Sequence, residues 1–146
     1  QDIKKYIDKS LNLQSFEILK NEDFYEIRNY YQNAKADAIH CFERIKKFLK
    51  KDKNILEIGG GVHLLTSFLN QEYKITSIEP GGFTRAADEI RSQIITRNKL
   101  NIHTMPLEEF KTDEKFDFIF SMNVLEHTKD IEEHLNHCVK LLKDNN

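Results

Sequence analysis

The amino-terminal part of the chain carries apolar residues at helical spacing. Two stripes repeat every three or four positions, and the clearer one contains Ala38, Cys41, Phe42, Ile45, Phe48 and Leu49. Because positions three and four apart share one face of an α-helix, this pattern predicts amphipathic helices that each bury a single stripe. We therefore expect residues 1–50 to form an amino-terminal helical segment.

From residue 51 onward, short apolar runs alternate with longer segments of helical period. The expected strands are residues 54–58, 74–78, 101–105 and 116–122, and the expected helices are residues 63–69, 84–98 and 129–143. The last helix places its apolar stripe at Ile131, Leu135, Cys138, Val139 and Leu142. Alternating strands and helices form βαβ units, which build a parallel sheet covered on both faces. The pattern predicts an α/β fold with a Rossmann-like, doubly wound parallel sheet over residues 51–146, in one domain with the N-terminal helices.

Composition and charge narrow the classes of partner. The 146 residues contain 22 Lys and Arg against 24 Asp and Glu, and a net charge of −2 gives no electrostatic footprint for nucleic acid. No apolar run reaches the roughly 18 residues of a membrane span, so we expect no membrane partner. Cys41 and Cys138 lie far apart and form no CxxC motif, which is typical of a reduced, cytoplasmic protein.

The motif EIGGG, residues 57–61, ends the first expected strand with three glycines. Ligands bind at the carboxyl ends of parallel strands, and glycine lets a ligand touch the backbone there. A triphosphate-binding loop needs a Lys-Ser or Lys-Thr that is absent here, and Leu64 replaces the third glycine of a dinucleotide-binding loop. The motif therefore favours a ligand without a pyrophosphate, and a tight turn without any ligand is the structural alternative.

Glu79 ends the second expected strand, about 20 residues after the glycines. An acidic residue in this place accepts hydrogen bonds from ribose hydroxyls. Pro80 biases the Glu79 backbone toward an extended conformation, which projects the carboxylate from the end of the strand. The pair of features indicates an adenosine ligand, and a solvated strand-end carboxylate is the alternative.

These motifs resemble those of the class I methyltransferases that use S-adenosylmethionine, in particular the small-molecule enzymes that contain VLEH. EIGGG is similar to their first motif, and SIEP, residues 77–80, to their second. PLEEF, residues 106–110, and FDFIFSMNVLEHTKD, residues 116–130, follow in the same order. The resemblance covers about residues 50–143. It implies methyl transfer to a small-molecule acceptor by direct displacement, with S-adenosylhomocysteine as the product.

The resemblance also implies which residues bind the cofactor. They are Glu57, Gly59, Gly60, Gly61, His63, Glu79, Pro80, Met105, Pro106, Leu107, Ser121, Met122 and Asn123. Glu57 is expected near the methionine ammonium, or as a buried acid that caps the loop. Pro106 replaces an acidic residue that often lies near the adenine, which leaves that contact to the backbone of residues 105–107. Asn123 is expected at the methyl-transfer end, where the stacked prolines of nucleobase methyltransferases are missing.

No catalytic residue stands out, and no metal site is expected. His127, His134, His137 and Cys138 show no recognised ligand spacing. His127, in the VLEH segment, is a weak candidate for a general base, and a structural role for it is the alternative. Two other functions stay open: a methyltransferase-like binding or scaffold module without turnover, and a nicotinamide-dependent oxidoreductase.

The resemblance leads us to expect further strands after residue 143, because the family fold has seven. Residues 51–146 would then be a core that is incomplete at its carboxyl end, with the apolar fourth strand at an edge. Because an apolar edge strand invites pairing with another chain, we expect self-association there. At the other end, residues 1–50 are expected to close over the cofactor as a lid, with Tyr30 and Tyr31 at the start of a helix.

Overall fold

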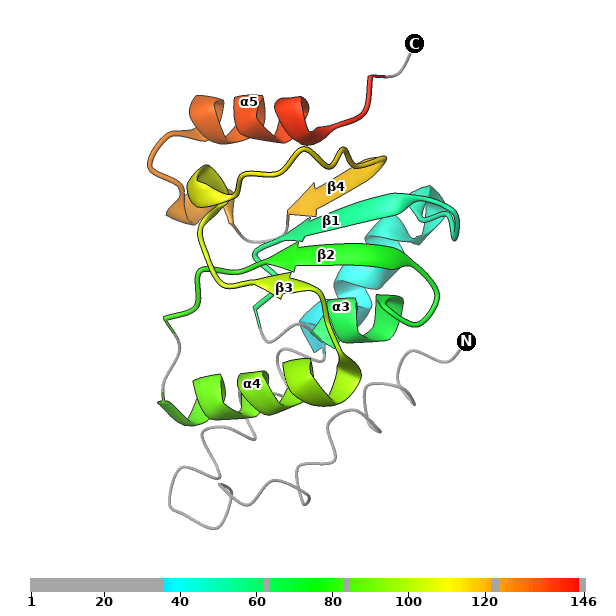
Figure 1. Ribbon diagram of the computed structural model, residues 1–146, viewed down its shortest axis with the longest axis vertical. Helices are drawn as coiled ribbons and strands as arrows, with labels where there is room; N and C mark the ends of the chain where they lie inside the picture. Colours follow the sequence, from blue (N-terminus) through cyan, green and yellow to red (C-terminus); the bar gives the residue numbers. More distant parts are fainter. Residues whose placement is uncertain (1–35, 62–63, 83–84, 122–123, 145–146) are drawn as a thin grey trace.

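A parallel sheet forms the centre of the protein in the computed structural model, which describes residues 36–61, 64–82, 85–121 and 124–144. In these ranges the sheet has four strands in the order β3-β2-β1-β4, and every neighbouring pair is parallel (Figure 1). The strands are β1 (Asn54–Ile58), β2 (Lys74–Ile78), β3 (Ile102–His103) and β4 (Phe118–Ser121). This arrangement confirms the predicted α/β class.

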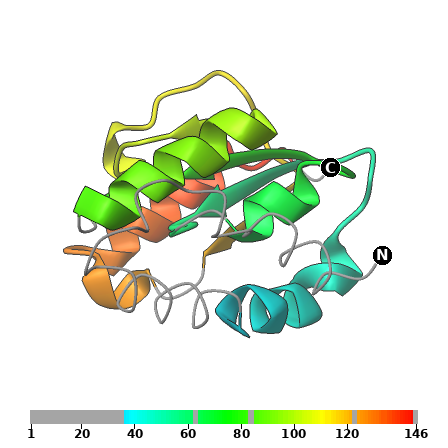
Figure 2. The same cartoon turned by 90° about the horizontal axis from the view of Figure 1, so that it is seen from below.

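Helices cover both faces of the sheet. A helix over residues 36–45, the 3₁₀ turn η3 (Lys46–Phe48), α3 (Leu64–Leu69) and α4 (Arg85–Asn98) lie on one face. On the other face lie α5 (Ile131–Leu141) and the 3₁₀ turns η4 (Leu107–Glu109) and η5 (Leu125–His127). Figures 1 and 2 show α5 separated from α3 and α4 by the strands. No helix within the described residues has the length and apolar content to cross a bilayer.

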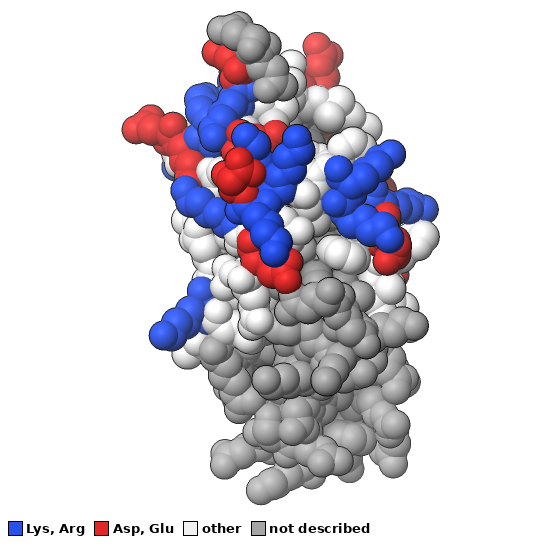
Figure 3. Space-filling model, turned by 90° about the vertical axis from the view of Figure 1, so that its right-hand side faces the viewer, with Lys and Arg blue, Asp and Glu red and all other residues white. Residues whose placement is uncertain are grey.

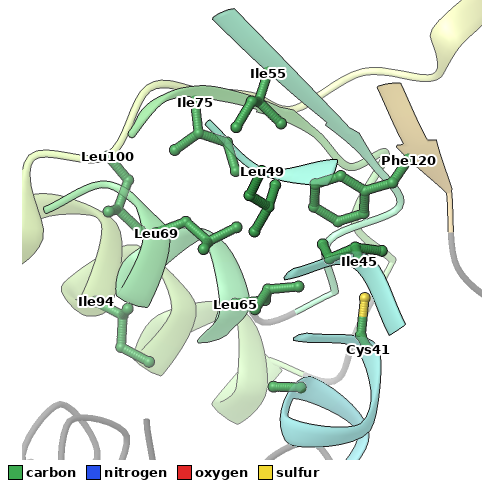
Figure 4. Close-up of a cluster of buried hydrophobic side chains, with 11 residues drawn as sticks. Cys41, Ile45, Leu49, Ile55, Leu65, Leu69, Ile75, Ile94, Leu100 and Phe120 are labelled. Carbon is green, nitrogen blue, oxygen red and sulfur yellow. The ribbon is translucent and has the colours of Figure 1, made fainter. Parts of the chain in front are cut away.

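Alternation along β1 builds a separate hydrophobic core on each face. Ile55 packs into the cluster on the α3 side, whereas Leu56 and Ile58 pack into the cluster on the α5 side. The first cluster (Figure 4) consists of Ala38, Cys41, Ile45, Leu49, Ile55, Leu65, Leu69, Ile75, Ile94, Leu100 and Phe120. Because residues 38–49 contribute to it, the described part of the N-terminal segment shares its core with the sheet. The lid prediction, with Tyr30 and Tyr31, lies outside the described residues.

β4 is shorter than its apolar run predicts. Phe116 is fully buried but pairs with Leu142 as an isolated parallel bridge, through hydrogen bonds with the backbone of Leu141 and Lys143. Asp117 then turns toward β1, and its carboxylate accepts a hydrogen bond of 2.8 Å from the Asn54 N–H. Regular pairing with β1 therefore begins only at Phe118.

The amino ends of the strands form a charged surface. Figure 3 shows Lys and Arg side chains intermixed with Asp and Glu on this side of the molecule. Ion pairs link Lys74 to Glu114 at 2.8 Å and Lys143 to Asp117 at 2.9 Å. The mixture of signs agrees with the small net charge and gives no continuous basic patch.

Candidate functional site

The glycine loop after β1 exposes its backbone at the carboxyl end of the sheet. Gly59 and Gly61 adopt positive φ angles of 73° and 59°, a conformation that glycine enters without steric cost. The Gly59 N–H donates to the Ile78 carbonyl at 2.8 Å, which anchors the loop to β2. A Cβ on Gly61 would find no atom within 4 Å, so the loop faces open space beside this residue. That space admits a ligand close to the main chain.

Glu79 joins the loops that follow β1 and β2. Its Oε2 accepts from the Gly61 N–H at 2.9 Å, and its Oε1 accepts from the Gly81 N–H at 3.1 Å. The side chain is 8% exposed, so the alternative of a solvated strand-end carboxylate is wrong. An ionised carboxylate accepts about four hydrogen bonds, which leaves two acceptor positions for hydroxyl groups of a ligand.

Glu57 is a buried acid on the α3 face of the sheet. It is 5% exposed, and its Oε2 has no hydrogen-bond partner within the described ranges. Burial raises the pKa of its carboxyl to about 8; a hydrogen bond from the Ser77 hydroxyl lowers the pKa, and the nearby Glu79 carboxylate raises it. A cation beside Glu57 would favour the ionised form and offset the cost of burying it.

A cavity of about 430 Å³ lies on the α5 face, next to the same loops. Its apolar wall consists of Ile58, Ile78, Pro80, Pro106, Leu107 and Val124. Its polar wall consists of Gly59, Glu108, His127, Thr128, Lys129, Asp130, Glu133 and His134. A ligand that reaches both this cavity and Glu57 must cross the carboxyl ends of β1 and β2, where the glycine loop and Glu79 lie.

The structure brings most of the predicted cofactor residues to this edge. Gly59, Pro80, Pro106 and Leu107 line the cavity. Met105 packs partly buried against the α5-side cluster. Ser121 pairs in register with Ile58 at the end of β4, and its hydroxyl is buried without a partner among the described residues. The predicted residues His63, Met122 and Asn123 lie outside the described residues.

The histidines differ in environment. The His127 side chain is 77% exposed at the cavity, with Nε2 3.5 Å from the Glu126 carboxylate. His134, which sequence reasoning did not place in the site, is buried in the cavity wall. Val124 was also missed, although its position just after β4 is a signal that could have identified it. The part of the chain that the structure describes holds no cluster of three or more His, Cys, Asp or Glu residues suited to a metal.

Curated proteins with related sequences are longer than this chain. An uncharacterized protein of Mycobacterium tuberculosis (strain H37Rv) is 36% identical over 95 residues, which are 61% of this chain and 32% of that protein. The ubiquinone biosynthesis O-methyltransferase of Rhodopseudomonas palustris (strain TIE-1) is 26% identical over 117 residues, which are 80% of this chain and 42% of the relative. The chain therefore spans less than half the length of both relatives.

A solved structure and a family comparison agree with these sequence relatives. The plantazolicin methyltransferase BpumL, in complex with a pentazolic desmethylPZN analog and SAH, has a TM-score of 0.59 at 18% identity. That likeness covers 97% of this chain and 56% of the other, and it shows a shared fold. Residues 27–146 match the family described as Methyltransferase domain, which is most of the chain. Because this match covers most of the chain and agrees with the parallel sheet, the chain belongs to the methyltransferase domain family.

Proposed function

We propose that this chain binds S-adenosylmethionine and is the cofactor-binding part of a methyltransferase that acts on a small-molecule acceptor. The observation that carries the proposal is Glu79, a buried carboxylate that the N–H groups of Gly61 and Gly81 hold, and near which Ile78 and Pro80 line an apolar cavity. This arrangement offers acceptors for ribose hydroxyls beside a space for a base. The nicotinamide alternative is not favoured, because the chain belongs to the methyltransferase domain family.

The two faces of the sheet offer different chemistry to the two ends of the cofactor. On the α3 face, Glu57 offers a carboxylate to the methionine ammonium. The Gly59 and Gly61 N–H groups already donate to Ile78 and Glu79, so within the described residues Gly60 is the glycine left to face the methionine carboxylate. On the α5 face, the cavity beside Pro80, Leu107 and Val124 offers apolar contact to the adenine. Glu79 lies between the two regions and serves the ribose. His63, Met122 and Asn123 stay in the proposal as cofactor residues on the resemblance alone.

The cofactor supplies an activated methyl group on a cationic sulfur, and its leaving group is a neutral thioether. The acceptor lone pair forms the new bond to the methyl carbon while the carbon–sulfur bond breaks, and the electron pair of that bond stays on sulfur. The chain has to hold the sulfonium in line with the acceptor and to exclude water. His127 stays the weak candidate for a general base that the VLEH motif gives; its exposed imidazole lies at the cavity assigned to the adenine.

Titration calorimetry of the chain with S-adenosylmethionine, S-adenosylhomocysteine and NAD tests this proposal. We expect both adenosyl ligands to bind and NAD not to bind. Glu79→Ala should weaken binding tens-fold or more, because the lost pair of charge-assisted hydrogen bonds contributes about 2–3 kcal/mol in all. Glu72→Ala, which removes a carboxylate from the far end of β2, is the matched control. Binding of NAD without S-adenosylhomocysteine would overturn the proposal, and cofactor binding without turnover across acceptors would favour a scaffold module.

The outer edge of β4 supports a second proposal, self-association through this side of the sheet. β4 ends the strand order, so within the described residues no strand pairs with its outer edge. Leu135 and Val139 of α5, the helix on one face of the sheet, are 51% and 65% exposed. Phe48, which is 52% exposed, stacks on Phe118 at 5.6 Å between ring centroids on the other side. Unpaired strand groups beside exposed apolar side chains fit a second copy of the chain.

The cysteines, and the absence of a membrane-spanning helix from the described residues, bear on the location of the protein and its classes of partner. Cys41 and Cys138 are free, and burial raises the pKa of the Cys41 thiol to about 12, which keeps it unreactive. We therefore propose a cytoplasmic location with reduced cysteines. We propose no nucleic-acid or membrane partner.

A further inference from the structure

Three histidines near the carboxyl end of the chain have different surroundings. The His127 side chain is exposed, and the His137 Nε2 lies 3.2 Å from the Phe110 carbonyl oxygen. His134 is only 2% exposed, and neither of its ring nitrogens has a hydrogen-bond partner among the described residues. Its backbone N–H donates to the Asp130 carbonyl at 3.1 Å in the first turn of α5. The imidazole is thus a buried polar group whose hydrogen-bonding capacity no described residue uses.

An unused imidazole in this position lowers stability. A buried polar group without a partner costs about 1–3 kcal/mol, whereas an apolar side chain on the same face of α5 would stabilise the core. Leu141, which lies two turns further along α5, shows that this face accepts a leucine, because it is 5% exposed. The fold therefore has no need of a polar ring at residue 134, and a ligand is the partner that would satisfy it.

The position of His134 identifies where that ligand lies. His134 is one of the residues that line the 430 Å³ cavity, whose apolar side includes Pro80, Leu107 and Val124, and its ring nitrogens are buried beside that cavity. The torsion about the Cβ–Cγ bond of a histidine is broad, so the ring can turn a nitrogen toward a group that enters the cavity. Glu108, Lys129, Asp130 and Glu133 also line the cavity, and the two glutamates offer it hydrogen-bond acceptors. Apolar walls and these acceptors suit a flat heterocycle that carries an amino group.

We propose that His134 is a specificity-determining residue that hydrogen-bonds the edge of the adenine base in this cavity. The inference rests on the proposed function, because it assumes an adenosyl ligand. Neutral imidazole carries one N–H donor and one acceptor nitrogen. The adenine 6-amino group is a donor, so the acceptor nitrogen of the imidazole is the one that pairs with it.

Calorimetry with two ligands tests this role: S-adenosylhomocysteine and its analogue with purine in place of adenine, which lacks the 6-amino group. The wild-type chain should bind S-adenosylhomocysteine about tenfold more tightly than the analogue. His134→Leu should lose about tenfold in affinity for S-adenosylhomocysteine and most of the preference for it over the analogue. His134→Gln, which keeps a donor and an acceptor, should retain part of the preference. The matched control His137→Leu, three residues further along α5, should keep the wild-type ratio.

The thermal midpoint of the unliganded variants separates a role in recognition from a role in folding. His134→Leu should melt above the wild type, because a buried unpaired polar group is removed. A folded His134→Leu chain that keeps the wild-type affinity and the wild-type ratio would overturn this inference and leave the proposed function intact. A wild-type chain that binds neither ligand would overturn the proposed function and the role of His134 with it.

Discussion

At the amino ends of β1 and β4, polar side chains pair with one another and Asn54 Oδ1 is the exception, whereas at the carboxyl ends several buried polar groups have no partner within the described residues. Asp117 accepts from the Asn54 N–H and from Lys143, and Glu114 accepts from the Asn54 amide and from Lys74. At the opposite ends, the unpaired groups are Glu57 Oε2, the Ser121 hydroxyl and both ring nitrogens of His134.

This difference separates stability from function along the same strands. A paired network holds the amino ends in register, because loss of the Asp117 or Glu114 carboxylate would leave a donor of the buried Asn54 unsatisfied. The carboxyl ends keep unpaired groups and glycines with positive φ, features that lower stability unless a ligand completes them. Substitutions at the carboxyl ends should therefore change ligand binding, and substitutions at the amino ends should change unfolding alone.

Gly61→Val should have the largest effect on binding. The new side chain would fill the open space beside the loop, where the cofactor backbone contact is expected, and S-adenosylhomocysteine binding should fall below detection by calorimetry. The positive φ of 59° adds about 1–2 kcal/mol of strain, so the thermal midpoint should fall modestly. Gly82→Val is the control for strain, because its φ is 89° and a Cβ there also meets no atom within 4 Å. Normal binding of S-adenosylhomocysteine by Gly61→Val would show that the glycine loop is a structural turn that does not contact the cofactor.

Glu57→Gln should raise the free energy of unfolding at alkaline pH, although substitutions at buried sites usually lower it. The pKa of Glu57 is raised from 4.5 to about 8 by burial, so the folded chain holds this proton at a pH where the unfolded chain has lost it. The stabilising contribution is complete below about pH 4.5 and is lost as the pH rises through about 8, at up to about 1.4 kcal/mol per pH unit.

The glutamine variant lacks this titration. Above pH 8 we expect the unliganded variant to unfold with a free energy a few kcal/mol above that of the wild type, as measured by urea denaturation across pH. Its affinity for S-adenosylmethionine should nevertheless fall about tenfold, because the ammonium loses its counter-charge. Glu72→Gln should change neither quantity. Parallel pH profiles of wild type and Glu57→Gln would contradict the assignment of a buried, protonated Glu57.

The central strands of the fold could be predicted because both of their faces are buried. β1 and β2 have the predicted bounds, since the runs NILEI and KITSI pack helices on each side. β3 is only Ile102–His103, because it ends the sheet on one side and pairs with β2 alone. The glycine loop and Glu79 were also recognisable from sequence, since their chemistry depends on residue type and spacing.

The orientation of α5 could not be predicted from its periodicity. The apolar stripe of this helix was expected to be buried, but Ile131, Leu135 and Val139 are at least half exposed. His134 and Leu141 are buried instead. Periodicity identifies which residues share a helix face, whereas the bridge between Phe116 and Leu142 helps to decide which face meets the sheet. For the same reason the sequence did not indicate a role for His134, because a histidine beside an apolar stripe is typical of the boundary between the buried and the exposed face of a helix.

Asp117→Ala tests the amino-end network and should lower stability by about 1–3 kcal/mol at neutral pH, because the Asn54 N–H loses its acceptor. The hydrogen bond from that N–H, and then the Lys143 ammonium, hold the pKa of Asp117 below its usual value. The contribution is therefore present above the pKa of the unfolded chain and is lost as the pH falls through the lower folded value. Denaturation curves should converge in acid, and S-adenosylhomocysteine affinity should not change. A loss of affinity would show that the two ends of the strands are coupled.

The smallest effect on stability is expected at the exposed apolar stripe of α5, Leu135 and Val139, which are more than half exposed in the isolated chain. Leu135→Lys combined with Val139→Lys removes apolar surface that the isolated chain leaves in water, so the unfolding free energy should stay within about 0.5 kcal/mol of the wild type. Sedimentation should nevertheless change: the wild type should self-associate as concentration rises, and the double variant should remain a monomer, because like charges would face each other across the interface. Glu132→Gln, on the same helix, is the control.

The wild-type chain should bind cofactor with little methyl transfer, because an acceptor site needs walls beyond the cofactor cavity. A monodisperse wild-type monomer that turns over an acceptor at ordinary rates would contradict both expectations, and would make the exposed stripe a solvent-facing surface rather than an interface.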